Sequence, residues 1–109
     1  MNESVLNTIK KMLGLSEDYD AFDIDIIVLI NSALATLAQV GIGPYTGFRI
    51  SGSDETWELV LGDRLDLESA KEYVYLKVRT IFDPPTSGTV MDAYKSQLSE
   101  LEWRLNVRE

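Results

Sequence analysis

Hydrophobic residues at helical spacing mark the first predicted helix, in residues 4–13. They follow the i, i+4, i+7, i+8 spacing of a helix that buries one face: Val5, Ile9, Met12 and Leu13. Gly14 comes next, and glycine readily adopts the left-handed backbone conformation that often ends a helix. We therefore predict a helix from about Ser4 to Leu13 that ends at Gly14.

The most hydrophobic segment, residues 24–40, is apolar on nearly every side of a helix. Aspartates precede it, and an aspartate side chain accepts hydrogen bonds from the free amides of a first helical turn. We predict a helix that begins near Asp20 or Asp23 and is covered by neighbours on all sides. Asn31 interrupts the apolar pattern. It is either a core residue hydrogen-bonded to the backbone of the loop at residues 41–53 or a polar contact across a subunit boundary.

The helical pattern stops at residues 41–44, where two glycines and a proline occur together. Residues 48–50 then alternate between apolar and polar side chains, which predicts a short extended segment. Residues 55–61 fit a short helix that turns Trp57 inward. The middle of the chain is therefore predicted to be an elaborated loop.

A third long helix is predicted from about Leu67 to Phe82, with Asp66 as its cap. Its apolar face carries Leu67, Ala70, Val74, Val78, Ile81 and Phe82. Two prolines follow Asp83, and a residue before proline is pushed out of the helical conformation. The helix should therefore end at Phe82.

A fourth helix begins after Thr86 or Ser87 as its cap and extends to about Val107. Its apolar stripe is fully regular: Val90, Tyr94, Leu98, Leu101 and Leu105. With 109 residues, 45% of them hydrophobic, the chain has the size of one domain with one core. We predict a single all-α domain over residues 1–109, a small bundle of about four helices with one short extended segment in a middle loop.

Composition narrows the possible functions. The chain has 18 acidic and 10 basic residues, no histidine and no cysteine, which gives a net charge of −8. The missing cysteines exclude disulfides and thiolate chemistry, and the missing histidines remove the commonest general base and metal ligand. A net acidic protein is repelled by phosphate, so we do not expect this protein to bind nucleic acid over a broad surface. The longest apolar run is too short for a membrane helix and contains Asp25, so we expect no membrane partner.

Two apparent motifs fail on spacing. The acidic run at residues 17–25 would place Phe22 and Leu29 at ligand positions of a calcium loop, so we interpret it as helix capping and a solvated face. Glycines at residues 41–47 do not match a phosphate loop, because they follow a helix and no lysine comes after them. We therefore predict no metal, no cofactor and no catalytic residue, and we expect that the protein is not an enzyme.

Aromatic side chains are the candidates for contacts with a partner: Tyr45, Phe48, Trp57, Tyr73, Tyr75 and Trp103. Tyr73 and Tyr75 are about 200° apart on a helix, so one of them must point away from the core. Trp103 lies roughly opposite Leu101 on the fourth helix. It must therefore either pack under the N-terminal helix or contact a partner.

Three stretches together resemble the small head–tail connector, or adaptor, proteins of long-tailed bacteriophages and prophages. The first is Phe22-Asp23-Ile24-Asp25-Ile26-Ile27 with Ile30-Asn31-Ser32 and Gly41-Ile42-Gly43-Pro44. The second is Tyr73-Val74-Tyr75-Leu76-Lys77-Val78-Arg79 with Phe82-Asp83-Pro84-Pro85-Thr86-Ser87, and the third is Leu101-Glu102-Trp103-Arg104-Leu105-Asn106. The similarity extends from about Val5 to Val107.

This resemblance implies a structural protein of the virion neck, assembled in the host cytoplasm. It implies a homo-oligomeric ring, usually of twelve copies, that lies beneath the portal protein, extends the DNA channel and offers a platform to the next neck protein. DNA would pass through without specific binding. Two other hypotheses stay open: a small acidic regulator or inhibitor that binds a basic protein partner, and a minor hydrolase with a serine–lysine or carboxylate pair.

Overall fold

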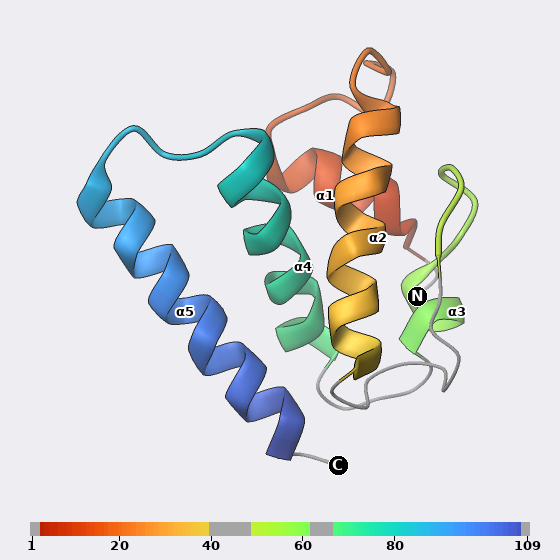
Figure 1. The fold of residues 1–109 in the computed structure, drawn as a ribbon. Coiled ribbons are helices and arrows are strands. Elements are labelled where there is room, and N and C mark those ends of the chain that lie inside the picture. The colour runs from red at the N-terminus through yellow and green to blue at the C-terminus, as the bar shows by residue number, and fades with distance from the viewer. Residues whose placement is uncertain (1–2, 40–48, 62–66, 108–109) are drawn as a thin grey trace.

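Helix α4 lies at the centre of the fold, between α2 and α5 (Figure 1). The computed structural model describes residues 3–39, 49–61 and 67–107. These residues form five helices: α1 (Val5–Met12), α2 (Asp23–Gln39), α3 (Trp57–Leu61), α4 (Leu67–Phe82) and α5 (Gly88–Val107). Helices α2 and α5 run in one direction and α4 in the opposite one. The predicted all-α bundle is confirmed, with the short helix at Trp57 as its fifth member.

Two helix ends follow the predicted signals, at Gly14 and Ser87, whereas within the described chain no amide of α2 donates to the side chain of Asp20 or Asp23, its predicted caps. Ser4, which the sequence did not single out, caps α1, since its side chain accepts a hydrogen bond from the Asn7 amide at 3.1 Å. Gly14 follows α1 with a φ of 86°, in the left-handed region that favours glycine. Ser87 caps α5 by accepting from the Val90 amide at 3.3 Å. The predicted bounds of α4 match the structure, while the proposed cap Asp66 lies outside the described residues.

The core forms where α1, α2 and α5 each turn one apolar face toward α4. Its fully buried members include Val5, Leu6 and Ile9 of α1, Ile26, Ile30 and Leu37 of α2, Tyr73, Val74 and Val78 of α4, and Leu101 of α5. The many contacts between α2 and α4 and between α4 and α5 identify α4 as the central helix. Burial of this apolar surface is the main favourable contribution to the stability of the fold.

Helix α2 is not covered on all sides, so that prediction is wrong. Ile24 is 79% exposed and Val28 is 60% exposed. The buried residues of α2 fall on the half of the helix that faces α1 and α4, and in the described part of the chain no element covers the other half. Although α2 has apolar residues on every side, only one side of the helix is buried in the described structure.

Three residues of the predicted apolar stripes are also exposed, the first being Met12 of α1 at 40%. Ile81 is 65% exposed and Val90 is 39% exposed. Both lie near the connection between α4 and α5, where Figure 1 shows the two helices diverging. Part of the space between these helices holds Arg79, whose guanidinium lies 5.9 Å from the centre of the Tyr94 ring. Polar packing thus replaces the expected apolar contact at this end of the bundle.

Asn31 anchors the backbone that precedes α3. Its side-chain amide donates to the Ile50 carbonyl at 3.0 Å, and its side-chain oxygen accepts from the Ile50 amide at 2.7 Å. Both residues are buried. The interpretation of Asn31 as a core residue is confirmed. In the predicted extended segment, the backbone of Ile50 is hydrogen-bonded to the Asn31 side chain and not to a neighbouring strand. Phe48 lies outside the described residues.

The N-terminal segment pairs with the residues that begin α3. Ser4 and Thr56 form an isolated antiparallel bridge, in which the Val5 amide donates to the Glu55 carbonyl and the Trp57 amide to the Glu3 carbonyl, both at 3.0 Å. The Trp57 indole N–H donates to the Thr8 hydroxyl at 3.1 Å. These contacts bring α3 against α1 and place Trp57 in the core.

Candidate interface surfaces

Two of the predicted partner contacts are core residues instead. Trp57 is 1% exposed and Tyr73 is 0% exposed. Trp57 is buried because the N-terminal bridge holds α3 on α1, and Tyr73 because α4 is surrounded by other helices. Neither side chain is available to a partner in this conformation. Tyr45 and Phe48 lie outside the described residues.

Tyr73 joins α4 to α5 through a polar contact. Its hydroxyl donates to the Glu102 carboxylate at 2.8 Å. Burial raises the pKa of Tyr73 well above its ordinary value, and the hydrogen bond and negative charge of Glu102 raise this pKa further. Helix α5 is thus fixed by this bond as well as by apolar contacts at Leu98 and Leu101.

Replacing Tyr73 with phenylalanine should lower the free energy of unfolding by about 1–2 kcal/mol at neutral pH, because it removes a hydrogen bond to a charged acceptor. It should also change the pH dependence. Since the folded-state pKa of Tyr73 is raised, its contribution is complete below its ordinary pKa of 10.0 and declines as the pH rises above that value. Denaturant unfolding between pH 8 and about pH 11 measures both effects.

The matched control is Tyr19→Phe, because Tyr19 is a surface residue that is 47% exposed. We expect the unfolding free energy of this control to decline with pH as in the unchanged protein. The decline should be smaller in Tyr73→Phe. Parallel curves for all three proteins would contradict the role assigned to the Tyr73 hydroxyl.

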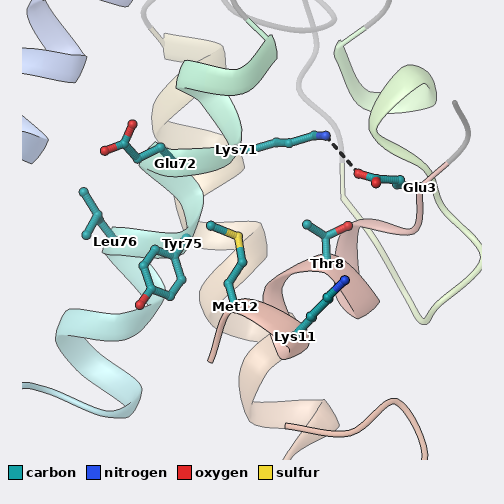
Figure 2. Close-up of a pocket in the computed structure, with 8 residues that line it drawn as sticks. All are labelled: Glu3, Thr8, Lys11, Met12, Lys71, Glu72, Tyr75 and Leu76. Carbon is teal, nitrogen blue, oxygen red and sulfur yellow. Dashed lines mark hydrogen bonds and ion pairs between the residues drawn. The ribbon is translucent and has the colours of Figure 1, made fainter. Parts of the chain in front are cut away.

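Tyr75 borders a hollow of about 660 Å³ between α1 and α4 (Figure 2). The lining residues mix charged and apolar side chains: Glu3, Thr8, Lys11, Met12, Lys71, Glu72, Tyr75 and Leu76. Lys71 forms an ion pair with Glu3 at 2.9 Å across one side. The two hydroxyls already make structural hydrogen bonds, since Thr8 donates to the Ser4 carbonyl at 2.6 Å and Tyr75 accepts from Arg79 at 3.0 Å. This hollow therefore presents no free nucleophile beside a base.

Trp103 is the most exposed of the aromatic candidates in the described chain, at 67%. It lies on the side of α5 opposite the fully buried Leu101, as helical geometry predicts. Of the two predicted alternatives, packing under the N-terminal helix is therefore wrong. An exposed tryptophan is a strong candidate for a partner contact, because such residues dominate binding energy when they become buried.

Sequence reasoning missed the exposed face of α2 and a buried lysine on α1. Lys10 is 1% exposed, and its ammonium group lies 2.9 Å from an Asp23 carboxylate oxygen and donates to the Glu17 carbonyl at 3.0 Å. These contacts tie α1 to the start of α2, since a buried charge requires polar partners. The position of Lys10, one residue after buried Ile9, does not indicate this role in the sequence. The interpretation of the acidic run as capping and solvated surface also omits the ion pair that Asp23 makes with Lys10.

Within the described ranges, no cluster of three or more acidic side chains could hold a metal ion. In the same ranges no helix has the length and hydropathy needed to cross a membrane. The surfaces that stand out are instead the exposed apolar residues of α2 and the exposed Trp103 of α5. Such residues are suited to contacts with other proteins.

Comparison with known proteins identifies the family. A family model described as "Phage connector protein" matches residues 5–109, which is nearly the whole chain. No curated protein and no solved structure matches significantly. The matched residues include all three sequence stretches noted above. The chain belongs to the phage connector protein family, whose role in the phage particle is structural.

Proposed function

We propose that this chain is a ring-forming subunit of the phage neck. Copies assemble under the portal protein, twelve being the usual number implied by the resemblance, and together they extend the DNA channel and join the head to the tail. The family match over residues 5–109 carries this proposal. The portal protein and the next neck protein are the expected partners. The site of action is the virion neck, after assembly in the host cytoplasm.

The chemistry of the chain supports a structural role. A net charge of −8 suits a channel wall that DNA must slide past, because like charges prevent adhesion to phosphate. The exposed tryptophan and the exposed face of α2 offer surface for contacts between proteins. Cosedimentation with the purified cognate portal oligomer tests the proposal. We expect stoichiometric binding, and a chain that remains in the supernatant at micromolar concentrations would contradict it.

The protein should not bind duplex DNA measurably at physiological salt. A protein that neutralises six or more phosphates needs a basic stripe, whereas this sequence has 18 acidic against 10 basic residues. A gel shift at low micromolar protein and ~150 mM salt, where the Debye length is ~8 Å, checks this expectation. A retarded band would argue against a passive channel wall.

An acidic inhibitor of a basic protein is the second candidate, because the same net charge favours it. The two hypotheses predict different partners. An inhibitor would bind one basic protein as a small complex whose affinity falls steeply with salt. A connector would bind the portal oligomer in many copies and retain that binding through apolar contacts at moderate salt.

A further inference from the structure

Two exposed helix faces have no partner within the described part of the chain. The face on α2 carries Ile24, Val28, Ser32 and Ala35, all exposed and spaced along one side of the helix. The face on α5 carries Ala93, Ser96, Ser99 and Trp103, with the acidic Asp92 and Glu100 between them, all exposed and on one side. We refer to these as the α2 face and the α5 face. Each lies on the side of its helix away from the buried residues that pack toward α4, so the two faces point in different directions.

We infer that the α2 face of one copy packs against the α5 face of the next copy of this chain. This inference rests on the proposed ring and specifies which surfaces form it. A ring requires a head-to-tail contact, in which two different surfaces of the same subunit meet. The two faces meet that requirement, and each contains a large apolar side chain that is more than half exposed: Val28 on α2 and Trp103 on α5.

The sizes of the side chains are complementary in one orientation. Along α2 the face begins with large residues, Ile24 and Val28, and continues with the small Ser32 and Ala35. Along α5 it begins with small residues and ends with Trp103. If the two helices pack in parallel, a large residue meets a small one at three of the four levels, and only Ser32 faces another small residue, Ser99. Antiparallel packing would place Trp103 against Ile24 and leave small residues facing small ones.

The direction of the helices agrees with parallel packing. Helices α2 and α5 run the same way within one copy (Figure 1). Rotation about a ring axis roughly parallel to these helices preserves their direction, so α2 of one copy meets α5 of the next in parallel. A two-fold axis perpendicular to the helices would reverse one of them. Parallel packing of α2 on α5 is therefore compatible with such a ring and incompatible with a two-fold axis perpendicular to the helices.

Charges at the borders of the two faces are also complementary. Asp25 borders the α2 face and Lys95 borders the α5 face; both are exposed, and neither has an ion-pair partner in the described chain. In the parallel arrangement these two borders lie on the same side of the contact. On α5 the nearby Glu100 is already paired with Arg104 at 2.6 Å, and Asp92 is one turn from Lys95 on the same helix. In the parallel arrangement the next copy therefore gives Asp25 a basic neighbour, and it gives Lys95 an acidic neighbour in addition to Asp92 of its own helix.

Cysteine cross-linking tests the contact directly, because the chain has no cysteine of its own. The double variant Val28→Cys/Ser96→Cys places one thiol at the middle of each face. We expect mild oxidation in the presence of the portal oligomer to give a ladder of covalent dimers, trimers and larger species on a non-reducing gel. Val28→Cys alone should give no ladder, and neither should Val28→Cys/Ser53→Cys, whose second thiol lies in the exposed loop before α3.

The outcomes separate this inference from the proposed function. If native mass measurement shows a ring on the portal but the Val28→Cys/Ser96→Cys ladder is absent, other faces form the contact and this inference is wrong while the function stands. If no multimer forms with the portal at all, both are wrong. A charge exchange adds a second check. Asp25→Lys and Lys95→Asp should each weaken ring formation several-fold, and the double variant should restore it, while circular dichroism shows that all three remain folded.

Discussion

Replacing Trp57 with alanine will lower the free energy of unfolding by about 3–5 kcal/mol, because a fully buried aromatic side chain leaves a cavity in the core. Trp57 is 1% exposed and also donates its indole N–H to Thr8, so this hydrogen bond is lost as well. For a domain of this size the melting temperature should fall by about 12 °C or more. Thermal unfolding followed by circular dichroism measures the change.

The chain offers its own matched control, since its second tryptophan is a surface residue. Trp103→Ala should change the free energy of unfolding by no more than about 0.5 kcal/mol, as is usual for surface substitutions. The same variant should weaken assembly on the portal by about tenfold or more if Trp103 is an interface anchor. Equal destabilisation by both substitutions would contradict the placement of the two tryptophans.

The second large effect is expected at Asn31. Asn31→Leu removes both hydrogen bonds to Ile50 and leaves a buried amide and a buried carbonyl without partners. Each unsatisfied group costs about 1–3 kcal/mol, so a loss of several kcal/mol is expected in denaturant unfolding. The exposed neighbour Ser32 provides the control, because Ser32→Ala should leave stability nearly unchanged.

A second substitution at the same position gives a sharper test. Asn31→Asp keeps an oxygen for the Ile50 amide but places a carboxylate oxygen opposite the Ile50 carbonyl. This variant should become more stable relative to the unchanged protein as the pH falls and the carboxyl group gains a proton that it can donate. If the relative stability of Asn31→Asp is independent of pH, the hydrogen-bonding role assigned to the Asn31 amide is wrong.

Local signals in the sequence predicted the elements of this fold well. The prolines after Asp83 and the cap at Ser87 fixed the end of α4 and the start of α5, because both act through backbone geometry within a few residues. A core position for Asn31, bonded to the backbone of the following loop, was one of the two alternatives that the sequence left open, and the bonds to Ile50 decide for it. The predictions of the helix ends depend on interactions between residues a few positions apart, and these can be read directly from the sequence.

What covers each helix face could not be predicted in the same way. The apolar pattern of α2 predicted cover on all sides, whereas one side of the helix is exposed, because an apolar side chain in a sequence does not state which other element packs on it. Trp57 and Tyr73 are buried through contacts between distant segments, the N-terminal bridge and the bond to Glu102. Lys10 is buried for the same kind of reason, since its partners come from the connection to α2 and from α2 itself.

The central claim is that this chain forms a ring on the portal, and native mass spectrometry of the two proteins mixed together tests it most directly. The account predicts one dominant complex that contains the portal oligomer and a fixed, large number of copies of this 12.3 kDa chain, twelve if the family pattern holds. A chain that stays monomeric beside an unmodified portal oligomer, or that binds it in one or two copies, would contradict the claim.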